Sequence, residues 1–338
     1  MTATTTAISF TDLTDLLHAI LIRHGCSETV ARVLADNYAR AERDGSGSHG
    51  VFRMEGLVKT LATGWVDGRA KPVVEDVAPG FLRVDAANGF AQPALAAARA
   101  QFVKKCRTNG IALLAIRRSH HFGALWPDVE PFADDGLIAL SMVNSMTCAV
   151  PFGASKAVFG TNPIGFAAPV GNGAAPVVLD MATTTMSHGD VQLARRSGET
   201  LPEGVGFDAA GQPTRDANAI LEGGALAPFG GHKGSAISMM VELLCAGLSG
   251  GNFSWEFSWA DHPGAQTPYT GQIIIGISPE PGNTRPFALR AEDLITRLGD
   301  AGLTVYPGLR RRGVRARNDA NGIPLAPETL AALKALAG

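Results

Sequence analysis

Cysteine is scarce in this sequence. Only four occur among 338 residues, they are widely spaced, and none forms a CxxC pair. A protein made for an oxidising compartment would be expected to use its cysteines as a disulfide framework. The sequence gives no sign of such a framework, which argues against a small disulfide-bonded class.

An excess of charge of one sign is also missing. The sequence has 29 basic and 31 acidic residues, which leaves a formal net charge of −2. This balance offers no general electrostatic attraction to nucleic acid or to an anionic membrane. An anionic ligand would have to be bound by a local cluster of residues.

Long apolar runs are absent as well. The most apolar long segment, Ala236 to Leu248, contains Glu242 and is too short to span a bilayer. The first residues, MTATTTAISFTDL, lack a positively charged region followed by an apolar core, so we expect no secretory signal. We therefore expect a cytoplasmic protein with no membrane partner.

Hydrophobic residues make up 46% of the chain, which is enough for a sizeable core. Helical periodicity predicts three N-terminal helices. Thr11 is the predicted N-cap of the first and Ser27 of the second, which ends near Asp44. The third is expected after Gly50, with core residues at helical spacing at Val51, Met54, Val58 and Leu61.

The middle of the sequence alternates strand and helix patterns. Strands are predicted at Phe81–Asp85, Ile111–Ile116, Leu137–Val143, Pro163–Val170, Val177–Asp180 and Ile273–Ile277. Helices are predicted at about Pro93–Arg107, Gly234–Leu248, Ala291–Leu298 and Pro327–Leu336, and the Gly- and Pro-rich stretch Gly198–Gly231 as a long ordered excursion. This pattern predicts an α/β fold with a helical N-terminal layer and a mixed central sheet. We place an outer domain at residues 1–75 plus 300–338 and a central body, possibly split in two, at 76–300.

Gly45 to Gly50 matches G-x-G-x-x-G, the dinucleotide fingerprint of the Rossmann fold. That fingerprint needs a strand before it, whereas the preceding segment ARVLADNYARAERD has a helical pattern. We therefore predict a non-Rossmann fold. Gly231-His232-Lys233-Gly234-Ser235 has the wrong order for a phosphate-binding P-loop.

His49 and Arg53 are four residues apart, so on one helix their side chains would share a face. A guanidinium fits a carboxylate, and a histidine that titrates near neutral pH suits a proton donor. The core positions lie on another face, so we expect this pair to face a cleft. The alternative is an ordinary exposed pair on a solvated helix.

Other polar motifs have two interpretations each. Ser119 to Ala124 follows a predicted strand, at the position where α/β proteins place ligand-binding loops. Its two adjacent histidines have no third ligand at the spacing of a zinc site, so we expect no metal. Thr161 could orient a ligand or belong to a turn. Asp190 could fix the tautomer of a histidine. Arg310 to Arg312 could clamp a phosphate or be a solvated charge run.

Several motifs together resemble the type 2 malate/L-lactate dehydrogenase family of NAD(P)H-dependent oxidoreductases. The resemblance covers nearly the whole chain, and SHHFGALWPDVEPFA (Ser119–Ala133) resembles the Δ1-piperideine-2-carboxylate/Δ1-pyrroline-2-carboxylate reductases within it. The other motifs that carry it are DGSGSHG (Asp44–Gly50), FGTNPIGFAAP (Phe159–Pro169), LDMATT (Leu179–Thr184), HGD (His188–Asp190), PFGGHKG (Pro228–Gly234), TGQ (Thr270–Gln272) and YPGLRR (Tyr306–Arg311).

The resemblance implies a multi-domain α/β fold, a homodimer and NADPH as the cofactor. It implies His49 as the proton donor, supported by Ser48 and Asp190, and Arg53 and Thr161 as substrate contacts. The implied cofactor-binding residues are His121, Phe122, Gly123, Ala124, Leu125, Asp180, Met181, Ala182, His232, Lys233, Val305, Tyr306, Pro307, Gly308, Leu309, Arg310 and Arg311. The last segment lacks the acidic residue often found after Pro-Gly in the family, a departure that bears on the preference for NADPH over NADH.

The implied reaction is NADPH-dependent reduction of a cyclic imine carboxylate to L-pipecolate or L-proline. A 2-oxo acid reductase of the malate, lactate or ureidoglycolate type would use the same residues on a ketone. A hydrolase built on Ser48, His49 and Asp190 is a further alternative, although no G-x-S-x-G elbow is present. The last alternative is a carboxylate- or nucleotide-binding protein without catalysis.

Overall fold

The computed structural model describes residues 5–338. The first four residues, part of the segment in which no secretory signal was expected, lie outside the described residues. No helix within residues 5–338 is long and apolar enough to cross a membrane.

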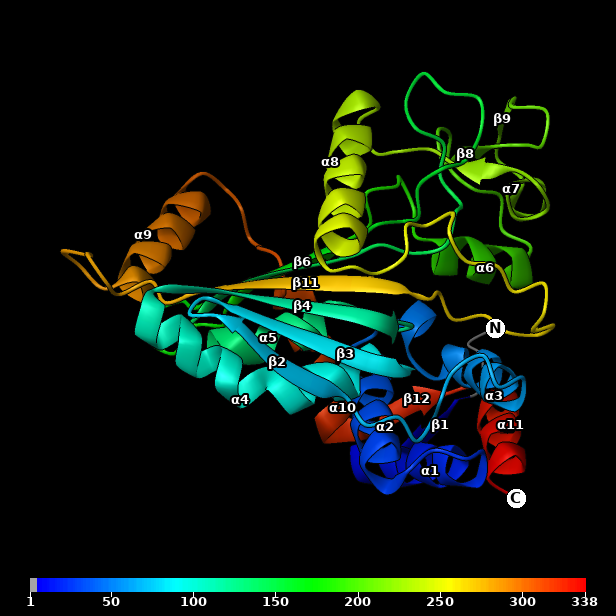
Figure 1. Cartoon of the computed structure of the whole chain (residues 1–338), viewed down its shortest axis with the longest axis horizontal. Helices are drawn as coiled ribbons and strands as arrows, with labels where there is room; N and C mark the ends of the chain where they lie inside the picture. Colours follow the sequence, from blue (N-terminus) through cyan, green and yellow to red (C-terminus); the bar gives the residue numbers. More distant parts are fainter. Residues whose placement is uncertain (1–4) are drawn as a thin grey trace.

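A seven-stranded mixed sheet forms the centre of the molecule (Figure 1). Its strand order is β2-β3-β4-β11-β5-β6-β7, in which β3 and β4 are parallel and the other neighbours antiparallel. The strands are β2 (Val73–Ala78), β3 (Phe81–Phe90), β4 (Ile111–His120), β5 (Ile138–Val143), β6 (Ile164–Ala168), β7 (Val177–Met181) and β11 (Thr270–Ile277). The predicted α/β class with a mixed central sheet is confirmed.

The central strand β11 supplies both faces of the sheet. Ile273 and Ile274 are each fully buried, and because side chains alternate along a strand they enter different cores. Ile274 packs in the core under α4 (Ala91–Asn109) and α5 (Trp126–Asp134). Ile273 packs on the other face, beneath α8 (His232–Glu242) and the π-helical segment Leu243–Leu248 that continues it.

A helical unit at one end of the sheet contains both ends of the described chain (Figure 1). Its elements share one hydrophobic core and are α1 (Phe10–Arg23), α2 (Glu28–Arg43), α3 (Met54–Ala62), β12 (Ile323–Leu325) and α11 (Pro327–Ala337). Strand β1 (Thr6–Ile8) pairs antiparallel with β12. The predicted domain limits, 1–75 plus 300–338 and 76–300, stay a prediction.

The prediction that Thr11 is the N-cap of the first helix is wrong. Ser9 caps it instead: its Oγ accepts a hydrogen bond from the Asp12 backbone N–H at 3.0 Å, and its hydroxyl donates to the Asp12 carboxylate at 2.7 Å. Ser9 has an acidic residue three positions later, which completes a reciprocal capping arrangement. The predicted N-cap Ser27 of α2 is confirmed by a 3.4 Å bond from Val30 N–H.

A smaller unit lies on the α8 side of the sheet (Figure 1). It contains α6 (His188–Ser197), α7 (Ala217–Leu221) and a three-stranded sheet of β10 (Ala225–Leu226), β8 (Gly206–Phe207) and β9 (Pro213–Thr214). Apolar residues from these elements, such as Val191 and Ile220, form a core of their own. The excursion predicted at Gly198–Gly231 is thus ordered by a separate hydrophobic cluster.

Several elements were not predicted, among them β2, α5, α6, α10 (Leu309–Asn321) and the strand pair β1–β12. Helix α5 contains Pro127 in its first turn and Pro131 in its interior, a composition that argues against a helix. Helix α10 includes the arginine run. The remaining helix, α9 (Phe287–Asp300), is longer than the predicted Ala291–Leu298.

Candidate active site

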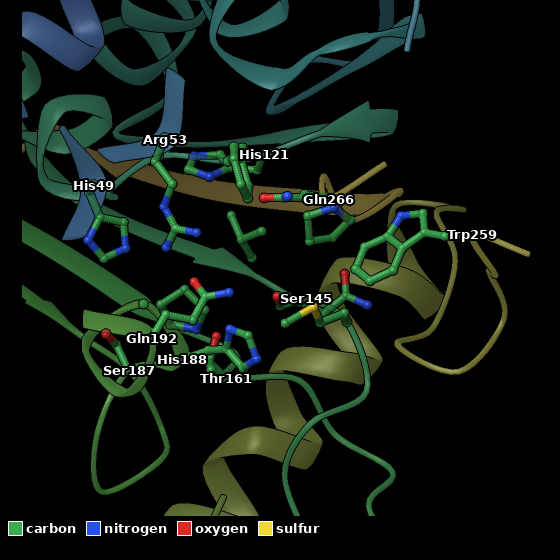
Figure 2. A pocket seen from close by; sticks show the side chains of 18 residues that line it. His49, Arg53, His121, Ser145, Thr161, Ser187, His188, Gln192, Trp259 and Gln266 are labelled. Carbon is green, nitrogen blue, oxygen red and sulfur yellow. The ribbon is translucent and has the colours of Figure 1, made fainter. Parts of the chain in front are cut away.

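A cavity of about 260 Å³ lies where the helical unit, the end of the sheet and α6 meet. Figure 2 shows side chains from all three parts converging on it, with His49, Arg53 and Gln192 on one side and Trp259 on the other. Its wall is formed by His49, Arg53, His121, Phe122, Gly123, Val143, Asn144, Ser145, Met146, Thr161, Pro163, Ser187, His188, Gly189, Gln192, Trp259, Gln266 and Pro268.

The local structure of His49 and Arg53 differs from the prediction. The third helix begins at Met54, and the two residues lie in successive 3-10 turns, Gly47–His49 and Val51–Arg53. The Glu42 carboxylate accepts the Val51 N–H at 2.9 Å and fills the space beside Gly50, where the two turns meet. Both side chains nevertheless line the cavity, as expected.

Gly50 makes this turn possible. A Cβ at this position would lie 2.1 Å from the Glu42 Oε2 atom and 3.0 Å from its backbone, so no side chain fits. The glycine is needed here for the close approach to α2, and not for binding a dinucleotide phosphate. The GxGxxG match therefore has a packing explanation.

Arg53 is a half-buried cation that has no acidic partner among residues 5–338. Within residues 5–338 its guanidinium forms no ion pair, and its Nε atom is buried without a hydrogen-bond partner. It lies over the Phe122 ring, with its Cζ 4.6 Å from the ring centroid. Burial lowers the pKa of Arg53 to about 10, so it stays charged at neutral pH. A half-buried guanidinium without an acidic partner in the described chain offers a site for a carboxylate ligand.

His49 is neutral at pH 7 in this cavity. Burial and, next, the Arg53 cation lower the pKa of His49 to about 3, while the Asp190 carboxylate acts in the opposite direction. The Ser48 hydroxyl lies 3.0 Å from Nδ1 of His49. When that hydroxyl donates to Nδ1, the neutral ring carries its proton on Nε2. Ser48 is buried and is absent from the cavity wall, so it acts behind the imidazole.

Asp190 is not brought into hydrogen-bonding contact with His49 among the described residues. Its backbone N–H is bonded to the N-capping Ser187 Oγ at 3.1 Å, and the residue is exposed. Its predicted support of His49 therefore reduces here to a charge effect through space. A Ser48–His49–Asp190 triad is not assembled, which leaves the hydrolase alternative without a structural basis.

The sequence reasoning missed His188 and Gln192. They lie four residues apart on α6 and face the cavity together, while Asp190 between them projects elsewhere. Burial and the Arg53 cation lower the pKa of His188 to about 4, so it is neutral too. Gln192 has a buried Oε1 atom without a partner. A helical reading of the segment from Ser187 onward would have selected 188 and 192 as one face.

Thr161 lies on the cavity wall, and its role as a substrate contact stays a prediction. Its carbonyl oxygen accepts both the backbone N–H and the hydroxyl of Thr183, each at 2.9 Å. These bonds join the segment before β6 to the one after β7. Thr161 is therefore held rigidly at the position where a ligand would meet it.

The predicted cofactor-binding residues fall into separate groups. His121, Phe122 and Gly123 line the cavity, and His121 Nε2 lies 2.8 Å from the Asp128 carboxylate. Asp180 is half-buried and accepts the N–H groups of Leu125 and Trp126 at 2.8 and 3.0 Å. Burial raises the pKa of Asp180. Asp180 thus fixes the loop that ends at Leu125 to the first turn of α5.

The remaining predicted cofactor residues lie outside this cavity wall. His232 and Lys233 open α8, and the segment from Val305 leads into α10. The Pro307 carbonyl accepts the Val178 N–H at 3.0 Å, and Arg311 donates to the Val178 carbonyl at 2.8 Å. This segment is thereby attached to β7, and the role of these residues stays a prediction.

The arginine run has partners inside the chain. Arg311 lies over the Trp126 ring at 5.5 Å, and Arg312 pairs with Glu130 at 3.3 Å. Arg315, one turn further, donates to Glu130 at 2.7 Å and to the buried Asp44 carboxylate. These residues attach α10 to α5 and to the end of α2. Within the described chain, no three His, Cys, Asp or Glu side chains are grouped to hold a metal ion.

Comparison with known proteins identifies the family. A sequence model of the malate/L-lactate dehydrogenase family matches residues 8–334. A protein of Pseudomonas putida described as a Delta(1)-pyrroline-2-carboxylate/Delta(1)-piperideine-2-carboxylate reductase is 62% identical over 337 residues, covering 100% of this chain and 98% of its own. The protein of the same description from Pseudomonas syringae pv. tomato is 60% identical, covering 99% and 97%.

Solved structures agree with the sequence comparison. The crystal structure of delta1-piperideine-2-carboxylate reductase from Pseudomonas syringae pv. tomato matches with a TM-score of 0.96 at 59% identity, covering 98% of this chain and 99% of that one. A dehydrogenase from Sinorhizobium meliloti matches with a TM-score of 0.88 at 29% identity, covering 99% of both chains. The predicted family is confirmed: the chain belongs to the malate/L-lactate dehydrogenase family.

Proposed function

We propose that this protein reduces the cyclic imines Δ1-piperideine-2-carboxylate and Δ1-pyrroline-2-carboxylate to L-pipecolate and L-proline with NADPH. The observation that carries the proposal is that Arg53, a half-buried cation with no acidic partner among residues 5–338, shares a small cavity with His49. The two relatives at about 60% identity, which are described as reductases of these compounds, support the choice of substrate.

Arg53 binds the substrate carboxylate. The guanidinium offers parallel N–H donors that match the two carboxylate oxygens, and burial strengthens the attraction because water does not screen it. The cavity volume of about 260 Å³ suits a compact ring with one carboxylate. Thr161, on the same wall, contacts the bound ring and limits its orientation.

His49 donates the proton to the imine nitrogen, because a protonated C=N group accepts a hydride far more readily than a neutral one. The substrate carboxylate neutralises Arg53, the cation that depresses the pKa of His49, so binding makes the imidazole easier to protonate. Ser48 fixes the ring orientation through Nδ1. Asp190 contributes its negative charge from the exposed side of α6.

The loop of His121 to Leu125 would hold the cofactor. Two buried atoms of the cavity residues, Arg53 Nε and Gln192 Oε1, have no partner within the described chain and would fit polar groups of the ligands. When bound, NADPH supplies the hydride that adds to C2 of the imine. Asp180–Ala182, His232-Lys233 and Val305–Arg311 complete its binding site, outside a Rossmann fold. NADH serves less well, and the working form is a cytoplasmic homodimer.

A 2-oxo acid reductase is the second candidate. The description of the family names malate and lactate, whose oxidised forms are 2-oxo acids. Arg53 would hold the carboxylate of a 2-oxo acid in the same way. His49 would then protonate a ketone oxygen. The cavity chemistry is shared, so substrate tests must separate the two candidates.

The deciding experiment is a screen of NADPH and NADH oxidation, followed by absorbance, with the two cyclic imines, pyruvate and oxaloacetate. We expect NADPH oxidation with the imines and little with the oxo acids. Chiral chromatography of the products should show L-pipecolate and L-proline. Faster oxidation with an oxo acid would overturn the imine assignment in favour of the second candidate.

A further inference from the structure

Glu242 is a fully enclosed carboxylate beneath the cavity floor. It lies at the end of α8, is 2% exposed, and forms no ion pair with a basic side chain among residues 5–338. An anion in such a place is costly unless hydrogen-bond donors surround it. The donors that surround Glu242 all come from segments that shape the cavity.

Each carboxylate oxygen accepts two hydrogen bonds. Oε1 accepts the Asn162 amide at 2.9 Å and the Ser254 hydroxyl. Oε2 accepts the Asn144 amide and the Ser254 backbone N–H, both at 3.2 Å. One side chain thereby joins three segments that are far apart in the sequence, namely those around residues 144, 162 and 254.

Two of those segments carry the cavity wall. Asn144 follows β5 and is itself a lining residue, as are the next two residues, Ser145 and Met146. Asn162 lies between the lining residues Thr161 and Pro163. The third segment begins the loop that brings Trp259, Gln266 and Pro268 to the opposite wall. Figure 2 shows Ser145 and Thr161 on one side of the cavity, with Trp259 and Gln266 beyond them.

Asn162 shows why an acceptor is needed here. Its backbone has a φ of +41°, a left-handed conformation that costs energy for a residue other than glycine. The side-chain amide is fully buried, donates to Glu242 and to Ser238 Oγ at 2.9 Å each, and accepts the Ser145 N–H at 3.3 Å. The bonds to Glu242 and Ser238 hold the strained residue in place, and the bond from Ser145 ties the two wall segments together.

We infer that Glu242 is a positioning residue for substrate binding, one that acts through Asn162 and Asn144 on Thr161 and Ser145. Its carboxylate accepts from both amides and from Ser254 at once, which no neutral side chain of similar size can do. The inference rests on the proposed function for its kinetic readout, because Thr161 is a proposed substrate contact. Its structural readout is independent of the substrate.

The test replaces Glu242 with glutamine, which keeps the shape but turns an N–H₂ group toward donors. We expect the KM for Δ1-piperideine-2-carboxylate to rise about tenfold, as for one buried hydrogen bond lost, with a smaller change in kcat. Amide hydrogen exchange should speed up in the peptides covering residues 144–146 and 161–163. The matched control is Glu256→Gln, since Glu256 is exposed on the same loop and accepts only the Phe253 N–H among the described residues.

A reciprocal exchange separates positioning from general stability. In E242Q/N162D the amide and the carboxylate change places, and aspartate tolerates the left-handed conformation of residue 162. We expect the KM of the double variant to lie below that of E242Q. N162D alone, with two facing carboxylates, should have a higher KM than E242Q. Ser254→Ala, which removes one donor, is the milder version should E242Q fold poorly, and it should raise KM in the same direction.

Two results would overturn the inference. One is a lower melting temperature in E242Q and S254A with KM and local exchange unchanged, because that is what a merely structural residue gives. The other is a rise in KM in E242Q/N162D that equals the combined rises of the two single variants. If the wild-type protein reduces no imine, the proposed function fails, while the hydrogen-exchange comparison still decides whether Glu242 positions the wall.

Discussion

Replacing Arg53 with methionine removes a single charge that has two separate effects in this cavity. Methionine keeps an unbranched side chain against Phe122 but offers no N–H donor to a carboxylate. The variant also takes away the cation that, after burial, contributes most to the low pKa of His49. We therefore expect weaker substrate binding together with a more basic His49.

The sizes of both effects follow from the structure. A hydrogen bond to a charged group is worth about 1.5–3 kcal/mol, which corresponds to a rise in KM of about 10- to 150-fold. The pKa of His49 should rise from about 3, because one of its two main depressing causes disappears. It should stay below its ordinary value of about 6.5, because burial, the larger cause, remains.

The assay combines kinetics with a titration. NADPH oxidation at varied imine concentration gives KM and kcat, and nuclear magnetic resonance of labelled histidine follows the imidazole signal of His49 against pH. Arg196→Met is the matched control: this neighbouring arginine lies over the Phe52 ring at 4.4 Å and is exposed, outside the wall that His49 lines. An unchanged KM in the Arg53 variant, or an equal rise in the control, would refute the carboxylate clamp. A His49 pKa that does not move would refute the electrostatic argument.

Three further predictions concern the histidines. His49→Asn should lower kcat by about 10²- to 10⁴-fold while circular dichroism shows an intact fold, and a kcat near that of the wild type would exclude His49 as the proton donor. The pKa of His49 is about 3 in the free protein, so its protonated fraction falls by about tenfold for each pH unit above that value. The kcat/KM for the imine should therefore decrease as pH rises through neutrality. A flat pH profile would contradict this prediction. His120 is fully buried, and burial lowers its pKa to about 3, below its unfolded value of about 6.5. Between these two pH values the unfolded chain binds more protons than the folded one. The free energy of unfolding therefore decreases as pH falls through this window. At pH 5 the free energy of unfolding should be about 2 kcal/mol lower for this reason. Denaturant unfolding of His120→Gln should show a weaker dependence of stability on pH over that range, and an unchanged dependence would contradict the prediction.

The fold was predictable where one periodicity dominated. Strand β11 has an unbroken apolar run, Ile273 to Ile275, and was predicted within three residues of its start. Helix α5 was not, because Pro127 and Pro131 argue against a helix while its buried residues, such as Trp126, are fixed by contacts far away in the sequence. Local propensity cannot report such tertiary contacts.

The site was predictable as a set of residues more than as a geometry. His49, Arg53 and Thr161 do line one cavity, but the expected helical turn under the first two is replaced by two 3-10 turns, since Glu42 from α2 occupies the space. That contact joins residues nine positions apart and leaves no periodic signal. The HGD motif predicts a role for the Asp190 carboxylate, whereas the member of the motif that lines the cavity as a side chain with a ring nitrogen is His188.

The charges in the cavity also suggest an order of events. With no ligand, Arg53 carries a full positive charge on the cavity wall at neutral pH, and it opposes protonation of both His49 and His188. A substrate carboxylate on Arg53 cancels that opposition, so proton uptake by His49 becomes easier once the substrate is bound. Binding and proton donation are linked through one guanidinium, which explains why a half-buried arginine with no acidic partner among residues 5–338 belongs in this site.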